Sequence, residues 1–354
     1  ECSITFAQVY DIARNTGAYL IEQLGVDRTP VAVFAGRKMV TPAYFLGVVY
    51  AGRPYAPIDA SLPDKRIEKI LENLCPRAIV ADRESLEHVE SIVDELAKAE
   101  GFDRPQIFIA EDISRFEQVA CADSNCKISE SAGDAVTDSE NDTDGGVVAG
   151  CAGKIDDSSR DMLAVVRRQM SMTDPLYIIY TSGSTGNPKG VMTSHLSLMT
   201  YINAYCDVMH IEESDVLGNQ SPLDYIAAIR DIYLPLKTGC STAIIPKEYF
   251  MEPNALFDYM NDKKVSSVGW SVSAFTILTS LGAFEEVGLK SLRKICFSGS
   301  VMPCRVLRKW QENLPEAHFV NQYGPTEATA SCTYYSVDHL VEEDEVLPIG
   351  KAYD

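Results

Sequence analysis

A stretch rich in glycine and hydroxyl side chains carries the most distinctive chemistry of this sequence. It reads Thr-Ser-Gly-Ser-Thr-Gly-Asn-Pro-Lys-Gly from Thr181 to Gly190 and follows an apolar run that ends at Tyr180. Glycines let backbone N–H groups surround phosphate oxygens, hydroxyls add donors, and Lys189 adds a positive charge. This pattern favours a polyphosphate-binding loop, and the alternative is an ordinary glycine-rich turn. The candidate phosphate-binding residues are Thr181, Ser182, Gly183, Ser184, Thr185, Gly186 and Lys189.

The loop is not a Walker loop, because Gly190 rather than Ser or Thr follows Lys189. It resembles the signature loop of the acyl- and aminoacyl-adenylate-forming enzymes, a superfamily that includes acyl-CoA synthetases and luciferases, and in particular the adenylation domains of nonribosomal peptide synthetases. Segments 50–59, 321–327 and 347–351 are similar to further family motifs in family order, with Tyr50 where the family has a lysine. The resemblance therefore covers nearly the whole chain.

The segment 321–327, Asn-Gln-Tyr-Gly-Pro-Thr-Glu, resembles the second ATP motif of the family. The Glu327 carboxylate suits Mg²⁺, a hard ion that prefers oxygen ligands, and the Thr326 hydroxyl can donate to the α-phosphate. The Tyr323 ring can stack on adenine, and the Asn321 amide can read an adenine edge. Without the family context, the segment would be a turn with a surface carboxylate. The resemblance implies that Asn321, Tyr323, Gly324 and Thr326 bind ATP, and that Thr181, Lys189, Thr326 and Glu327 are catalytic.

The resemblance implies an α/β fold over residues 1–354: the large N-terminal core of an adenylation domain, with layered subdomains, mixed sheets and helices packed on them. The implied reaction is attack of a substrate carboxylate on the α-phosphorus of ATP, which gives an acyl-adenylate and pyrophosphate and depends on positioning and charge neutralisation. The acyl group then passes to the phosphopantetheine thiol of a peptidyl carrier protein. The family's smaller C-terminal domain carries a mobile lysine and is absent from this sequence, so we expect the chain alone to be poorly active.

The segment Asp231 to Gly239 resembles the helix that follows the family's aromatic-Asp-x-Ser pocket motif, and it sets a register for the acyl pocket. In this register Tyr225 takes the aromatic position. Ile226 falls where amino-acid-activating relatives carry the aspartate that binds the α-ammonium. Because isoleucine cannot pair with a cation, we expect a hydroxy, keto or aryl acid, or recognition of the amine by Asp224 instead. An ordinary amino acid is the rival. The remaining pocket residues of this register are Ala227, Arg230, Gly269, Cys296, Ser298, Gln322, Ala330 and Ser331.

Arg230 is the unusual member of this set. In a pocket it can bind a second carboxylate or another anionic or polar group of the substrate. The alternative is an exposed helix arginine that faces water.

Alternating helical and extended patterns must position these residues. A helix is expected after Thr5, with a stop at Gly25, and strands are expected near 31–34, 55–59, 78–80 and 107–109, with helices between them. Such alternation favours a sheet layered between helices. Residues 117–161 are rich in Ser, Asp, Glu, Gly and Thr, which predicts an acidic surface insertion or loop.

Composition narrows the function classes. The net charge of −20, with no basic cluster, disfavours nucleic acid as a partner. No apolar run is long enough to span a membrane and no signal segment is present, so we expect a cytoplasmic protein whose ten cysteines stay reduced. Three alternatives stay open: a stand-alone acyl-CoA ligase, a carrier-protein D-alanine ligase, and a non-catalytic nucleotide-binding or interaction module.

Overall fold

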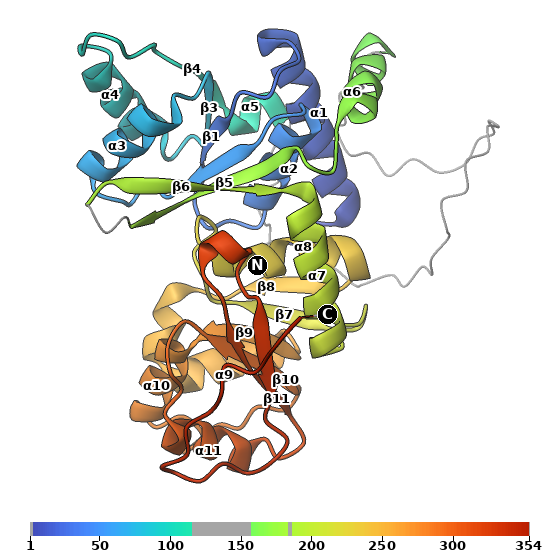
Figure 1. The fold of residues 1–354 in the computed structure, drawn as a ribbon, viewed down its shortest axis with the longest axis vertical. Helices are drawn as coiled ribbons and strands as arrows, with labels where there is room; N and C mark the ends of the chain where they lie inside the picture. The colour runs from blue at the N-terminus through green and yellow to red at the C-terminus, as the bar shows by residue number, and fades with distance from the viewer. Residues whose placement is uncertain (1–2, 115–156, 183–185, 354) are drawn as a thin grey trace, which may run out of the picture.

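The computed structural model describes residues 3–114, 157–182 and 186–353. These residues form two lobes, each built around one β-sheet, and Figure 1 shows the N-terminal lobe in blue to green above the C-terminal lobe in yellow to red. Gly183, Ser184 and Thr185 of the predicted phosphate loop lie outside the described residues, as does most of the predicted insertion. The last residues of the predicted insertion, 157–161, are helical and do not form a loop.

The N-terminal lobe contains a six-stranded sheet. Its strand order is β4 (Gln106–Ile109), β3 (Ala78–Ala81), β1 (Val31–Phe34), β2 (Tyr55–Ile58), β5 (Pro175–Ser182) and β6 (Pro188–Ser194). All neighbours are parallel except β6, which is antiparallel to β5. One face packs against α1 (Phe6–Leu24), α2 (Thr41–Tyr50), α5 (Ala110–Ser114) and α6 (Asp157–Gln169), and the other against α3 (Asp64–Leu74) and α4 (Leu86–Leu96). The all-apolar β1 is buried on both faces, as is typical of a parallel strand covered by helices.

The first helix follows its sequence signals. The Thr5 hydroxyl accepts a hydrogen bond from the Gln8 backbone N–H, and the Gln8 side chain accepts one from the Thr5 backbone N–H at 2.8 Å, which forms a capping box. Gly25 ends the helix with a φ of 70°, a value that glycine adopts without steric cost. The predicted start and stop of this helix are confirmed.

The C-terminal lobe contains a seven-stranded sheet. Its strand order is β13 (Lys351–Ala352), β12 (Thr333–Ser336), β11 (His318–Tyr323), β10 (Lys294–Ser298), β9 (Ser267–Ser271), β7 (Val216–Asn219) and β8 (Ser241–Ile244). β12 and β13 are antiparallel additions to an otherwise parallel sheet. Helices α7 (His195–Met209) and α8 (Ile229–Thr238) cover one face, and α9 (Pro253–Asp262), α10 (Val272–Ser280) and α11 (Cys304–Asn313) cover the other. Two mixed sheets with helices on both faces confirm the expected layered α/β architecture.

One arginine joins the two lobes. Arg37 lies just after β1, and its Nη2 donates to both the backbone carbonyl of Asn219, at 2.7 Å, and the Asn219 side-chain oxygen, at 2.6 Å. Its Nε donates to the Ser221 carbonyl at 3.3 Å, and its Nη1 donates to the Ile245 carbonyl. A single guanidinium therefore holds the carboxyl ends of β7 and β8 against the N-terminal lobe.

Among the described residues, no helix has the length and apolar character needed to cross a membrane.

Candidate active site

The predicted phosphate loop begins on β5 and ends on β6, and these two strands pair with each other. Thr181 at the end of β5 lies opposite Lys189 on β6, and the Thr181 hydroxyl donates to the Lys189 backbone carbonyl at 3.4 Å. Ser182, Gly186 and the Lys189 side chain are exposed, and Gly186 has a φ of 79°. The two-stranded hairpin thus presents hydroxyl groups and a lysine ammonium to solvent.

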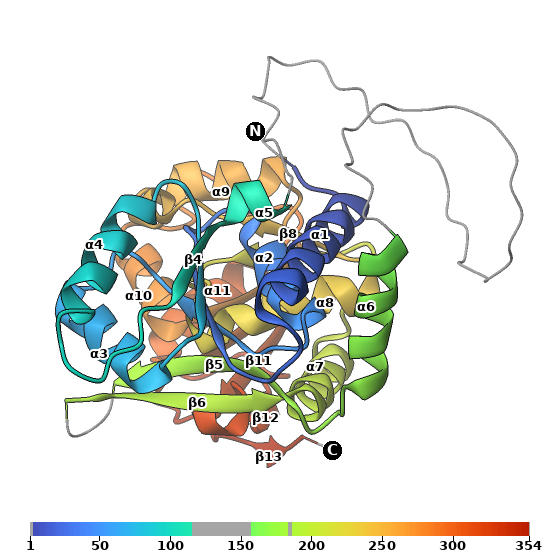
Figure 2. The ribbon, with the colours of Figure 1, turned by 90° about the horizontal axis from the view of Figure 1, so that it is seen from above.

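The second motif lies against this hairpin. The short helix η3 (Thr326–Ala328) follows β11 and packs against β6, and Figure 2 shows the β5–β6 hairpin beside β12 and β13. The Glu327 side chain is exposed, and no other described residue forms a hydrogen bond or ion pair with its carboxylate. Tyr323, at the end of β11, exposes 52% of its surface. Two segments about 140 residues apart in the sequence therefore converge at the junction of the lobes.

The backbone beside η3 is tightly packed. A Cβ atom on Gly324 would lie 2.4 Å from Ser331 Cα and 2.7 Å from the Cys332 nitrogen, so only glycine fits at this position. Thr329 and Ala330 both have positive φ values, 55° and 74°. Non-glycine residues rarely adopt this conformation, and such strain concentrates at functional sites. The turn that carries Glu327 is thus flanked by a position that only glycine fits and by two residues with positive φ.

Asn321 has a partner that the sequence did not indicate. Its Nδ2 donates to the Pro348 carbonyl at 2.9 Å, and the residue is buried. This contact ties β11 to the segment 347–351, the last of the recognised motifs. The amide N–H is therefore engaged within the protein, and its reading of an adenine edge stays a prediction.

Five of the predicted pocket residues come together on the face of the second sheet that α7 and α8 cover. Gly269 on β9 lies opposite Cys296 on β10, Cys296 lies opposite Val320 on β11, and Gln322 is two residues further along the same face. The Ser331 hydroxyl donates to Gln322 Oε1 at 3.3 Å. Arg230 on α8 points into this layer and exposes only 3% of its surface, so the alternative of a solvent-facing arginine is wrong.

The guanidinium of Arg230 rests directly on Gly269. A Cβ atom at position 269 would lie 2.3 Å from Arg230 Nε and 2.4 Å from its Cζ. On another side, the Arg230 Cζ lies 5.9 Å from the centre of the Tyr205 ring, within range of a cation–π contact. The absent side chain at position 269 is what makes room for the arginine.

The other predicted pocket residues are more dispersed. Ser298 lies two residues beyond Cys296 on β10 and is half-buried, and Ala330 packs at the edge of the core. In η1 (Ile226–Ala228), Ile226 is buried in the core and Ala227 is half-buried. Tyr225 exposes 55% of its surface, so its ring lies largely in solvent.

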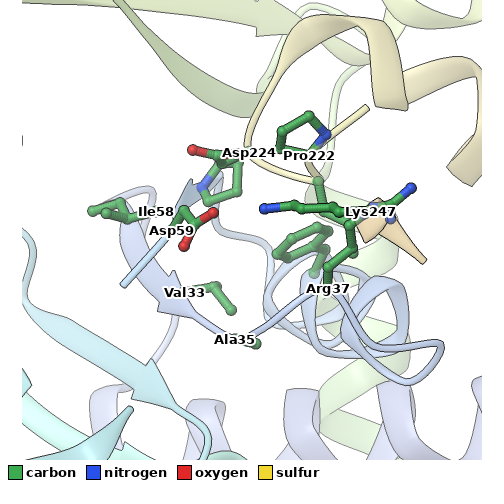
Figure 3. Close-up of a pocket in the computed structure, with 11 residues that line it drawn as sticks. Val33, Ala35, Arg37, Ile58, Asp59, Pro222, Asp224 and Lys247 are labelled. Atoms are coloured by element: carbon green, nitrogen blue, oxygen red, sulfur yellow. The ribbon is translucent and has the colours of Figure 1, made fainter. Parts of the chain in front are cut away.

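Asp224 lies in a different place from the rest of the predicted pocket. It lines a cavity at the carboxyl ends of β1 and β2 together with Arg37, Asp59 and Lys247, as Figure 3 shows, and no other predicted pocket residue lines this cavity. Burial, together with the nearby Asp59 carboxylate, raises the pKa of Asp224 above its ordinary value. The Tyr225 N–H donates to the Pro222 carbonyl at 3.1 Å and closes a turn that separates Asp224 from Ile226. Asp224 therefore does not join the Arg230 group, and its substitution for the ammonium-binding aspartate stays a prediction.

Three tyrosines belong to the site although the sequence did not single them out. Tyr201 and Tyr205 lie on α7, four residues apart on one helix face, and their ring centres are 6.0 Å apart. The Tyr205 hydroxyl lies 3.3 Å from the Cys296 sulfur. Tyr353 follows β13, and its ring lies 6.4 Å from that of Tyr201. The helical spacing of the first two was a usable signal, whereas nothing local marks Tyr353.

A hydroxyl-bearing hairpin lies against a carboxylate-bearing turn, and the buried Arg230 group lies in the adjoining sheet. This arrangement fits a nucleotide-binding α/β enzyme core. The chain belongs to the AMP-binding enzyme family, whose family model matches residues 1–353. The family resemblance drawn from its motifs is confirmed.

Relatives and solved structures agree with this assignment. The D-alanine--D-alanyl carrier protein ligase of Bacillus velezensis is 26% identical over 353 residues, which cover 99% of this chain and 59% of the relative. A Vibrio cholerae adenylation domain, AlmE, in complex with glycyl-adenosine-5'-phosphate superposes with a TM-score of 0.72 at 19% identity, covering 100% of this chain and 60% of that one. A four-domain nonribosomal peptide synthetase bound to AMP and glycine gives 0.70 at 18% identity, covering 99% and 21%. The chain thus spans about three-fifths of the curated relative's length.

Proposed function

We propose that this chain is the ATP- and acid-binding core of an enzyme that activates a carboxylic acid as an acyl-adenylate and releases pyrophosphate. The observation that carries the proposal is the packing of the β5–β6 hairpin, which bears Thr181 and Lys189, against the η3 turn, which bears Glu327. Adenylate formation from ATP requires groups that bind the phosphate oxygens and a carboxylate that binds Mg²⁺. Membership of the AMP-binding enzyme family supports the same reading.

Each part has a chemical task in this reaction. The hairpin hydroxyls and Lys189 neutralise and orient the phosphates, and the Thr326 hydroxyl donates to the α-phosphate. The exposed, unpaired Glu327 carboxylate fits Mg²⁺, which would spread the negative charge of the polyphosphate. The substrate carboxylate is itself the nucleophile at the α-phosphorus, so the protein supplies position and charge rather than a covalent intermediate.

The phosphopantetheine thiol of a carrier protein next attacks the acyl-adenylate, which forms a thioester and releases AMP. The name of the Bacillus relative, a carrier protein ligase, and the likeness to an adenylation domain support this acceptor over coenzyme A. The acceptor is decided by comparing turnover with a separate carrier protein and with coenzyme A. Faster turnover with coenzyme A would replace this proposal with that of an acyl-CoA ligase.

We further propose that the acid lacks an α-ammonium group. Ile226 is buried in the core at the position where the register expects an aspartate, and Asp224 lies in the separate cavity beside Asp59. A buried ammonium without an anionic partner is costly, so an amino acid would be bound poorly. A D-alanine or other amino acid substrate is the rival, and preferred turnover of one amino acid over its hydroxy and keto analogues would favour it.

ATP–pyrophosphate exchange in the full-length enzyme tests the core of the proposal. Lys189→Met should lower acid-dependent exchange by about 10²-fold or more, because a charge next to the phosphates is lost. Lys290→Met, at an exposed lysine far along the chain, is the matched control and should leave exchange unchanged. Acid-dependent exchange that survives Lys189→Met unaltered, or is absent for every acid class, would overturn the proposal.

A further inference from the structure

Buried polar groups that lack a hydrogen bond of good geometry gather around Arg230. The Nε and Nη2 atoms of Arg230, the Nε2 of Gln322 and the hydroxyls of Tyr201 and Tyr353 all lack a well-formed hydrogen bond. Arg230, Gln322 and Tyr201 expose 3%, 2% and 5% of their surfaces. We call these four residues the donor cluster. Buried polar groups are nearly always paired, so a concentration of unpaired donors points to a missing acceptor.

The four side chains belong to one site. The Tyr201 and Tyr353 hydroxyls both lie beside the Ser331 side chain, whose hydroxyl donates to Gln322 Oε1. Tyr201 also lies beside the Arg230 guanidinium. The residues come from α7, α8, β11 and the end of the chain, so their convergence is a property of the fold rather than of one helix face.

The positive charge of Arg230 is incompletely neutralised by the protein. The nearest carboxylate is that of Asp231, whose Oδ1 lies 3.6 Å from Arg230 Nε, too far for a hydrogen bond. The other oxygen of Asp231 accepts from Asn219 Nδ2 at 2.8 Å, and the same carboxylate also interacts with Arg37. One anion is thus shared between two guanidinium groups.

The polar neighbours of Arg230 do not supply the missing charge. Burial raises the pKa of the Cys296 thiol and those of the Tyr201 and Tyr205 hydroxyls, so all three are neutral near pH 7. A buried guanidinium is energetically costly when some of its N–H groups are unpaired and its counter-ion is shared with a second guanidinium. A ligand that supplies acceptors and negative charge removes this cost. A carboxylate does so, because its two oxygens accept bidentate hydrogen bonds from an arginine.

We propose that the donor cluster binds a second carboxylate at the distal end of the activated acid, so that the substrate class is a dicarboxylic acid. This proposal rests on the proposed function, because it places the acyl pocket at the Arg230 group. The reacting carboxylate faces the nucleotide site, and the distal one is held by Arg230 and the tyrosine hydroxyls.

Matched acids in the full-length enzyme test the proposal. ATP–pyrophosphate exchange is measured with glutarate against pentanoate and with 2-oxoglutarate against 2-oxopentanoate, pairs that differ only in the distal carboxylate. We expect each dicarboxylic acid to be favoured by about 10²-fold or more in kcat/KM, because the neutral partner leaves buried donors unpaired. Arg230→Leu should reduce this preference to within a few-fold, and Arg230→Lys should retain part of it.

Two further variants separate recognition from folding. Tyr201→Phe preserves the ring and should lower the preference for the dicarboxylic acids by several-fold without unfolding the chain. Arg104→Leu removes a surface arginine paired with Asp94 and should leave the preference intact. If Arg230→Leu lowers kcat/KM equally for both members of each pair, the arginine has a purely structural role and the proposal is overturned. A preference for the monocarboxylic acids would also overturn it.

Direct binding distinguishes failure of this proposal from failure of the proposed function. Isothermal titration of glutarate and pentanoate against the same protein needs no chemistry. Glutarate binding that Arg230→Leu removes, in a protein without exchange activity, would uphold the carboxylate site and sink adenylate formation. Exchange that occurs with acids but does not depend on the distal carboxylate would support adenylate formation and overturn the carboxylate site. Absence of both exchange and glutarate binding would overturn both proposals.

Discussion

Gly269→Ala tests the packing on which the Arg230 site depends. The added methyl group would lie 2.3 Å from Arg230 Nε, whereas an ordinary contact is about 3.5 Å, so the guanidinium must move by roughly 1 Å. Overpacking of this kind costs about 1–3 kcal/mol, and the lower chain entropy of alanine returns about 0.4–1 kcal/mol. We expect the free energy of unfolding to fall by about 1–2 kcal/mol.

Urea unfolding followed by circular dichroism measures this change, and a double-mutant cycle assigns its cause. In an Arg230→Ala background the obstacle is gone, so Gly269→Ala should be neutral or slightly stabilising, with a coupling energy of about 1–2 kcal/mol. Gly288→Ala is the control, because a Cβ atom there would meet nothing within 4 Å. An equal penalty in both backgrounds, or none in either, would refute the reasoning.

Three further perturbations follow from the geometry. Arg37→Ala removes the hydrogen bonds from Arg37 to the C-terminal lobe and should lower the free energy of unfolding by about 2–4 kcal/mol, against a change within about 0.5 kcal/mol for surface Arg104→Ala; similar curves for both would contradict the role of Arg37. Burial raises the pKa of Asp231 to about 6 from 3.8, so the folded chain holds this proton at pH values where the unfolded chain has lost it. The wild type should accordingly lose about 2–3 kcal/mol relative to Asp231→Asn between roughly pH 4 and pH 6, and urea curves at several pH values with a constant difference would exclude this. Glu327→Gln should raise the Mg²⁺ concentration for half-maximal exchange about tenfold or more while leaving the exposed turn folded, and an unchanged magnesium requirement would remove Glu327 from the metal site.

The sequence carried the local features of the fold well. Thr5 and Gly25 mark the first helix because capping depends on neighbours only three or four residues apart. The register taken from the family resemblance named both Gly269 and Cys296, which lie opposite each other on β9 and β10, and their lining of the acyl pocket stays a prediction.

Features that depend on long-range packing could not be predicted from the sequence. The turn at Pro222 to Tyr225 points Asp224 into a separate cavity, although it is only two residues from Ile226. The Tyr353 ring packs against Tyr201 in the Arg230 group, more than a hundred residues away in the sequence. The Asn321 side-chain amide donates a hydrogen bond to the Pro348 carbonyl. None of these partners is set by local pattern, because each arises from how strands and helices stack in three dimensions.

The division of the proposed nucleotide site between the lobes has a mechanical consequence. The phosphate hairpin belongs to the first sheet, whereas the Glu327 turn extends from the second, and Arg37 spans the seam between them. A bound nucleotide would therefore contact both lobes and stabilise the interface between them against separation. By linkage, a substitution that loosens the seam must weaken nucleotide affinity even without touching the ligand, and saturating nucleotide must return part of the stability that such a substitution removes.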